Sequence, residues 1–101
     1  MIALDLQRVA EIFKVLSHPT RLKVVLLLKE HGRICVCELM SHLNTTQSNL
    51  SQHLTVLKLT GLVESQRTGN MIHYRLAENE FLLHLLNNVE SFLTKETTLS
   101  E

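Results

Sequence analysis

Apolar residues recur at helical spacing along the first third of the chain. Between residues 3 and 16 they lie three or four positions apart, which predicts an amphipathic helix. Pro19 is well placed in the first turn of a second helix, which we expect to end near His31 with Gly32 as its cap. Apolar side chains surround this second helix on every side, so we expect it to be the central buried helix.

The middle of the chain combines short apolar stretches with polar turns. The β-branched stretch RICV, residues 33–36, predicts one edge strand, and CELMSHL, residues 37–43, predicts a short third helix. A polar NTTQ turn follows, in which Thr46 is the expected N-cap of a fourth helix that ends near Gly61. This fourth helix turns three residues inward: Leu50, Leu54 and Leu57.

The last third of the chain changes first to strand spacing and then back to helix spacing. Residues 62–76 alternate apolar and polar side chains on either side of a TGN turn, which predicts a β-hairpin. A final amphipathic helix follows, and beyond it we expect residues 96–101 to form a frayed tail. The apolar residues of that helix are Leu82, Leu85, Leu86, Val89, Phe92 and Leu93.

These elements occur in the order helix, helix, short strand, helix, helix, hairpin, helix. Two helices joined by a tight polar turn, residues 37–60, form a helix-turn-helix unit, and the hairpin directly after it, residues 62–76, is a wing. We therefore predict a mainly α fold with a small β-hairpin. It is a winged helix-turn-helix with five helices, in a single domain that spans residues 1–95.

Composition and charge narrow the class of protein. The chain has 101 residues, of which 45% are hydrophobic, so it is expected to fold around one core. Its net charge is zero, but residues 39–77 carry three Lys or Arg against one Glu, whereas residues 78–101 carry five Glu against one Lys. A mildly basic middle leaves nucleic-acid binding open without proving it.

The pattern also bears on the compartment. No apolar run is long enough to cross a bilayer, and the amino-terminal stretch lacks the pattern of a signal peptide. We therefore expect a soluble cytoplasmic protein that makes no membrane contact. In that reducing compartment Cys35 and Cys37, the only cysteines, are expected to be thiols and not a structural disulfide.

The outward face of the fourth helix is a candidate for reading DNA. It carries planar or short donor and acceptor side chains, which suit base edges in a major groove, and it has no charge before Lys58. Free N–H groups after Thr46 could also meet a phosphate. The alternative is a solvated, amide-rich helix turn. The candidate residues are Gln47, Ser48, Asn49, Ser51, Gln52 and His53.

Three stretches together resemble the arsenic-repressor (ArsR/SmtB) family of winged-helix, metal-sensing transcriptional repressors. They are LSHPTRLKVVLLL, ICVCEL and TTQSNLSQHLTVLKLTGLVESQRTGNMIHYRL, and the resemblance covers roughly residues 6–95. Its most specific parts are the recognition-helix core from Ser48 to Val63 and the G-x-x-x-x-Y-x-L wing from Gly69 to Leu76. The resemblance implies a homodimer built from the first and last helices, with one recognition helix in each half of a palindromic double-stranded operator.

The predicted wing offers further DNA contacts. Strand alternation places His73 and Arg75 on the face opposite Ile72 and Tyr74. Arg67 and Arg75 are candidates for phosphate or minor-groove contacts, and the alternative for either is a solvated strand residue. We expect His73, like His53, to form hydrogen bonds at the DNA surface and not to bind a metal.

The cysteine pair stands where the resemblance implies an inducer site. In the family, C-V-C-[DE]-L at this place binds soft metals or trivalent metalloids through thiolates, which makes Cys35 and Cys37 candidate ligands for As(III), Sb(III), Cd²⁺ or Pb²⁺ as an inducer. Two thiolates favour such thiophilic species over hard cations. Binding requires deprotonation, which the start of a helix assists.

The sequence departs from the family at two places. A third cysteine is common three residues further on in the family, but Met40 occupies that position here. The family's other metal site, on the last helix, needs several ligands, and only His84 is available near Glu78 and Glu80. A zinc or nickel sensor of that second type is therefore not expected. Further histidines, at positions 18, 31 and 42, are not expected to be ligands.

Several alternatives remain open from the residues. The two cysteines could act as a redox or reactive-sulfur switch, or they could simply be small apolar side chains in the core. The domain could bind DNA without any effector, or its winged helix could be a protein-interaction module, which the neutral net charge favours. We expect no enzyme activity, because there is no Gly-rich phosphate loop and no pairing of a nucleophile with a base.

Overall fold

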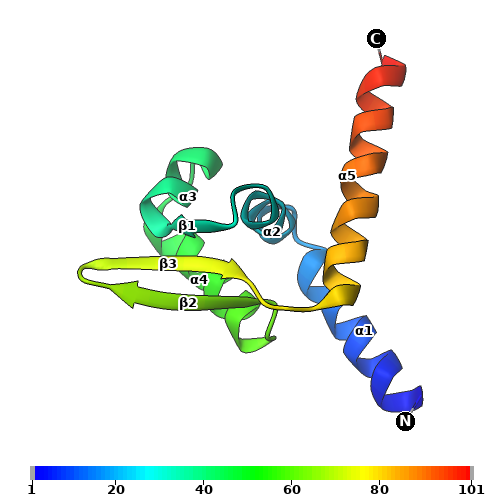
Figure 1. The fold of residues 1–101 in the computed structure, drawn as a ribbon, viewed down its shortest axis with the longest axis horizontal. Coiled ribbons are helices and arrows are strands. Elements are labelled where there is room, and N and C mark those ends of the chain that lie inside the picture. The colour runs from blue at the N-terminus through cyan, green and yellow to red at the C-terminus, as the bar shows by residue number, and fades with distance from the viewer. Residues whose placement is uncertain (1, 101) are drawn as a thin grey trace.

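The computed structural model describes residues 2–100 and the side chains of residues 5–95. Its elements are α1 (Ile2–Leu16), α2 (Pro19–His31), β1 (Arg33–Cys35), α3 (Val36–Leu43), α4 (Gln47–Leu59), β2 (Val63–Thr68), β3 (Met71–Leu76) and α5 (Glu80–Ser100). Their order confirms the predicted winged helix-turn-helix with five helices. Figure 1 shows the hairpin reaching out from one end of the molecule, while α1 and α5 lie at the other end.

Helix α2 is the central element, as its apolar surface predicts. Val24, Val25 and Leu28 are fully enclosed. The helix begins after His18, whose Nδ1 accepts the backbone N–H of Thr20 at 3.1 Å. It ends at Gly32, whose N–H donates to the Leu28 carbonyl at 2.8 Å and whose φ of 83° suits a residue without a side chain.

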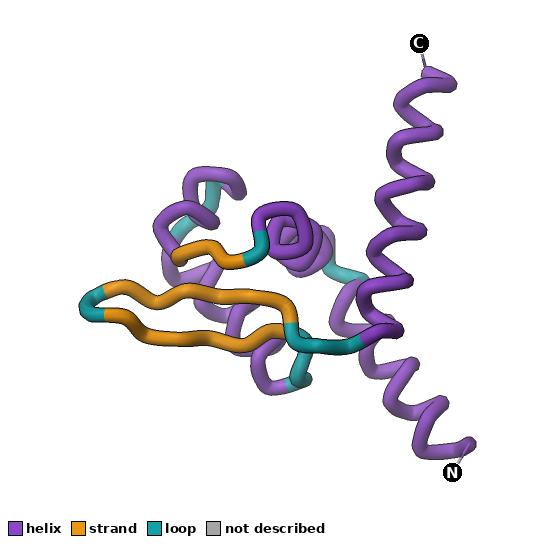
Figure 2. The backbone as a smooth tube through the Cα atoms, in the orientation of Figure 1, coloured by secondary structure: helices purple, strands orange, loops and turns teal. Residues whose placement is uncertain are grey.

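The three strands form one antiparallel sheet in the order β1-β3-β2 (Figure 2). Strand β1 lies at one edge and pairs with β3 in the register Arg33↔Arg75, Ile34↔Tyr74, Cys35↔His73. On the other side, β2 pairs with β3 from Val63↔Leu76 to Thr68↔Met71. The sheet therefore joins the strand that carries Cys35 directly to the wing.

One hydrophobic core joins all five helices to the sheet. The helix-turn-helix unit is anchored in it through Leu39 of α3 and Leu50, Leu54 and Leu57 of α4, each no more than 2% exposed. This inward row is the one that the leucine spacing predicts, and it fixes which face of α4 remains in solvent.

Helix α5 is longer than expected. It begins after Asn79, whose side-chain oxygen accepts the N–H of Leu82 at 3.0 Å, and its backbone stays helical to Ser100 where a frayed tail was predicted. No Gly or Pro interrupts this stretch. Along the part of the chain that is described, no helix has the length and apolar character needed to span a bilayer.

Core burial predicts unequal effects for two leucines of α4. Leu50→Ala should lower the free energy of unfolding by about 2–5 kcal/mol, because it leaves a cavity among packed side chains. Leu59→Ala on the same helix, where the leucine is 82% exposed, should change it by less than about 0.5 kcal/mol. Urea unfolding followed by circular dichroism compares the two, and equal losses would contradict this packing.

Candidate nucleic-acid interface and sulfur site

The outward face of α4 consists of short polar side chains. Thr46 Oγ1 accepts the backbone N–H of Asn49 at 3.1 Å, which confirms Thr46 as the N-cap. The Asn49 side chain donates to Thr45 Oγ1 at 2.8 Å. These bonds fix the helix start and leave the other amides and hydroxyls in solvent, where base edges could meet them. The exposed residues are Thr46, Gln47, Ser48, Asn49, Ser51 and Gln52.

His53 differs from the other candidates on α4 because it packs against another element. Its ring lies against that of His18 at the start of α2, with centroids 4.3 Å apart, and it is only partly exposed. Burial lowers the pKa of His53 from its ordinary value of 6.5, and the nearby His18 and Arg21 lower it further. The neutral imidazole therefore suits this ring contact between His53 of α4 and His18 at the start of α2, which we call the His18–His53 joint. Any DNA contact of His53 would use the same ring.

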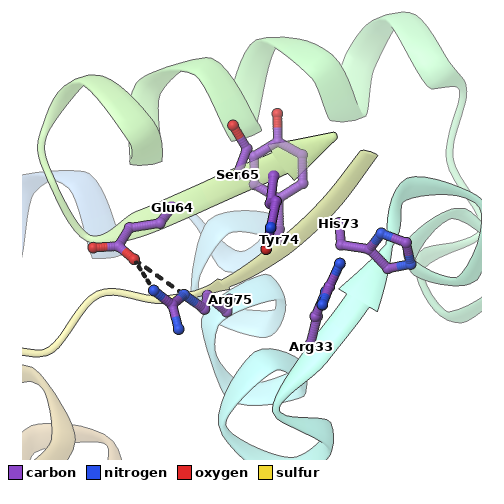
Figure 3. Close-up of a pocket in the computed structure, with 7 residues that line it drawn as sticks. Arg33, Glu64, Ser65, His73, Tyr74 and Arg75 are labelled. Carbon is purple, nitrogen blue, oxygen red and sulfur yellow. Dashed lines mark hydrogen bonds and ion pairs between the residues drawn. The ribbon is translucent and has the colours of Figure 1, made fainter. Parts of the chain in front are cut away.

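The wing carries an ion pair that the sequence does not predict. The Arg75 guanidinium donates to Glu64 Oε1 on the neighbouring strand, at 3.0 Å from Nε and 2.8 Å from Nη2 (Figure 3). Both side chains are well exposed, so the pair is worth less than about 1 kcal/mol and a phosphate could compete for Arg75. Arg67 is exposed near the hairpin turn.

A shallow pocket of about 270 Å³ lies on the outer face of the sheet and contains His73. The Nδ1 atom of His73 is buried and has no hydrogen-bond partner among the described residues. Arg33 lines the same pocket and donates to Thr68 Oγ1 at 3.2 Å. Sequence reasoning missed Arg33 as a basic group beside Arg75, because no local pattern indicates that β1 pairs with β3.

Cys35 and Cys37 meet at the junction of β1 and α3. Their Cα atoms are 5.4 Å apart and the two sulfurs are joined in a disulfide, whereas the sequence predicts free thiols. Two residues at i and i+2 of a strand share one face, and the turn from strand to helix brings this pair closer together than a continuing strand would. Cys35 is also the N-cap of α3, since its Sγ accepts the N–H of Glu38 at 3.4 Å. It is 3% exposed.

A second cavity, of about 470 Å³, opens beside this cysteine pair. Its walls come from three elements: the start of α3, the recognition helix α4 through Gln47 and Ser51, and the hairpin through Met71. Met40, which stands where the resemblance implies a third cysteine, lines it as well. The cysteines thus share a cavity with part of the polar face of α4.

One oxygen ligand lies beside the cysteines, because Glu38 Oε1 is 3.4 Å from Cys35 Sγ. Among the described residues, no group of three or more His, Cys, Asp or Glu side chains is arranged to hold a metal ion. The rings of His31 and His42 lie 5.3 Å apart at the ends of α2 and α3, and His84 is exposed on α5. Any ion at the cysteines would therefore meet sulfur and the carboxylate of Glu38, and not a cluster of histidines.

Comparison with known proteins agrees with this geometry. The model of the family described as "Bacterial regulatory protein, arsR family" matches residues 18–65, which run from the start of α2 into β2. The arsenical resistance operon repressor of Staphylococcus xylosus is 34% identical over 90 residues, 89% of this chain and 85% of that protein. This chain belongs to the ArsR family. The proteins of this family are regulators, so this chain is a regulator and not an enzyme, as expected.

Two further comparisons define how far the likeness extends. The arsenical resistance operon repressor of Escherichia coli K12 is 43% identical over 67 residues, which are 66% of this chain but only 57% of that repressor. The homodimeric winged helix-turn-helix domain Mb0332 of Mycobacterium bovis, a possible ArsR-family regulator, superposes with a TM-score of 0.79 at 29% identity. That match covers 94% of this ArsR-family chain and 86% of the solved one.

The His18–His53 joint makes stability depend on pH. Because the pKa of His53 is lower in the folded protein, the unfolded chain binds the proton more readily, so this contribution is complete above pH 6.5 and is lost as pH falls through the folded pKa. We expect His53→Gln to flatten the decline of unfolding free energy below pH 6.5, measured by urea unfolding. His84→Gln on exposed α5 is the control, and an unchanged decline in His53→Gln would rule the joint out.

Proposed function

We propose that this ArsR-family protein is a homodimeric repressor that binds palindromic operator DNA and leaves it when a thiophilic ion binds Cys35 and Cys37. The inducer would be a metal or metalloid such as As(III), Sb(III), Cd²⁺ or Pb²⁺. One observation carries the proposal: the cysteine pair lines a cavity whose other walls are the recognition helix and the wing. A regulator of this kind works in the cytoplasm, with its operator.

The DNA-binding part of the proposal is supported by the surface of α4 and the hairpin. The exposed amides and hydroxyls from Gln47 to Gln52 suit base edges in the major groove, and Thr46 leaves the helix start open toward phosphate. Arg67 and Arg75 on the wing would contact the phosphate backbone of the DNA, with His73 beside them. Arg33, across the sheet from Arg75, adds a positive charge to the same surface.

The proposed dimer is supported by apolar side chains of α1 and α5 that are exposed to solvent. Phe13 and Phe81 meet edge to face with ring centroids 6.1 Å apart, yet they are 51% and 39% exposed. Phe92, further along α5, is 62% exposed. A second copy of the chain would cover this surface, and the solved Mycobacterium bovis neighbour is homodimeric.

Binding of the proposed inducer needs the cysteines in their reduced form. The disulfide has no thiolate to offer, so a reducing compartment must open it before an ion can bind. Once reduced, both sulfurs lie at the start of α3, where the helix N-terminus favours a negative charge. The Glu38 N–H donates to Cys35 Sγ and favours a thiolate there, while the Glu38 carboxylate, 3.4 Å from the same sulfur, opposes it. The relatives named arsenical resistance operon repressors support an ion of this soft class.

The disulfide itself favours a second candidate function. Oxidation would join two residues of one turn beside the recognition helix, so the pair could act as a redox switch on DNA binding. The two functions differ in what releases the DNA: an ion bound to thiols in one case, and loss of the thiols in the other.

Fluorescence anisotropy on DNA from upstream of the gene tests the proposal. We expect the reduced protein to bind with an affinity that falls steeply with salt, and to be released by one thiophilic ion but not by Mg²⁺. Cys35→Ser with Cys37→Ser should keep the DNA affinity and lose the response. Release in this double variant would show that the ion binds elsewhere, whereas release of the native protein by oxidant alone would favour the redox function.

The dimer surface is tested by placing a charge on it. We expect Phe92→Glu to turn the dimer into a monomer in sedimentation velocity and to weaken DNA binding at least about tenfold, since a monomer reaches one half-site. Leu59→Glu is the matched control for the oligomeric state alone, because Leu59 is also exposed but lies on α4, where a new charge can affect DNA binding directly. A Phe92→Glu protein that remains dimeric would place the interface elsewhere.

A further inference from the structure

Sulfur is concentrated in one place in this molecule. The chain has two cysteines and three methionines. Both cysteines and two of the methionines, Met40 and Met71, line the cavity of about 470 Å³ between α3, α4 and the hairpin. The remaining methionine, Met1, lies outside the described residues. Four of five sulfur-bearing side chains thus face one small volume, which apolar packing of a core does not require.

The fold explains how these residues converge. Cys37 and Met40 are three positions apart on α3, so they lie on one side of that helix. Cys35 is opposite His73 in the sheet, and Met71 lies two residues before His73, at the first position of β3. Met71 is 46% exposed, so its flexible side chain is free to turn into the cavity.

We propose that the reduced cavity binds a soft monovalent cation of the Cu(I) or Ag(I) class, held by the thiolates of Cys35 and Cys37 and the thioethers of Met40 and Met71. This inference rests on the proposed function and names the ion for the same site. Thioethers are neutral soft donors that select Cu(I), and the cavity offers two of them beside two thiolates, whereas arsenic(III) would need a third thiolate from outside the chain. Zinc is disfavoured because no His, Asp or Glu cluster completes four ligands within the described part of the chain.

The disulfide has to be reduced before the cation can bind. A dithiol reductant gives two electrons and two protons to the Cys35–Cys37 bond, which yields two thiols and leaves the reductant as its own disulfide. The monovalent cation then replaces both thiol protons, which pass to solvent, and leaves a bis-thiolate with one net negative charge. The thioethers add no charge, so the loaded site stays a monoanion at the start of α3, where the helix dipole favours it.

Loading would connect elements that are otherwise joined only through the sheet. Met71 belongs to the hairpin and Met40 to α3, while Gln47 and Ser51 of α4 line the opposite wall. A cation that holds both methionines draws the hairpin toward α3 and changes its position relative to the recognition helix. The methionines are therefore the part of the site that transmits binding to the wing.

X-ray absorption of the selenomethionine-labelled protein tests this directly. The reduced, Cu(I)-loaded protein should show copper in the first shell of selenium, and Met71→Leu with Met40→Leu should abolish that signal. Leu replaces Met with little change in volume, so the fold should persist. A selenium spectrum without copper neighbours, in a protein that binds one Cu(I), would overturn the proposal.

Affinity supplies the second measurement. In competition with a Cu(I) chelator, Met40→Leu with Met71→Leu should weaken Cu(I) binding at least about tenfold, since even outer-shell losses cost that much at metal sites. Ile72→Leu, which changes the same cavity wall without touching sulfur, is the matched control. Met40→Cys should instead raise the affinity for arsenic(III), because it supplies a third thiolate.

The outcomes separate this inference from the function on which it rests. If Cu(I) binds and releases DNA through the cysteines but the methionine variants behave like the native protein, the thioether ligands are wrong and the repressor function stands. If arsenic(III) releases the native protein from DNA and Cu(I) does not, the ion class is wrong. If no ion binds the native reduced protein, both the inference and the inducer site fail.

Discussion

The pairing of β1 with β3 is the contact on which the functional parts of this molecule depend. Ile34, 2% exposed and opposite Tyr74, anchors a three-residue strand between the core and the wing. Because β1 turns into α3 immediately after Cys35, this pairing fixes both cysteines beside the hairpin. The same register sets Arg33 next to Arg75. Without it the cysteines would lie on a loop, and the cavity would lose one wall.

The sequence predicts the parts of this structure that local chemistry decides. Helical spacing of leucines gives α4 and its inward face, and the caps at Thr46 and Gly32 lie where side-chain chemistry places them. What it does not predict depends on contacts between distant segments: the His18–His53 joint, the place of Arg33, and the approach of Met71 to the cysteines. No periodicity encodes a neighbour 35 residues away, as Arg33 and Thr68 are.

Coupling between an ion and DNA requires an element with two arrangements that both ligands sense. The hairpin is the element of this fold placed to sense both ligands, because it is held to the core at the β1 edge and its turn projects away from the core (Figure 1). Shifts in it cost little, since its outer contacts are exposed ones such as the Arg75–Glu64 pair. A coupling of about 1–3 kcal/mol is the usual scale for such linkage, and it is reciprocal, so DNA must weaken ion binding equally.

A chain of zero net charge can still present a basic surface to DNA if its charges are separated. The acidic residues Glu80 and Glu90 belong to α5, at the end of the molecule away from the wing turn (Figure 1). Glu90 is also paired with Lys29 of α2 at 2.6 Å, which neutralises it locally. The longest extent is 45 Å, whereas salt screens exposed charges beyond about 8 Å. Phosphates at the wing would therefore sense Arg33 and Arg67, and Arg75 once it leaves its pair with Glu64, while the distant carboxylates of α5 would not cancel them.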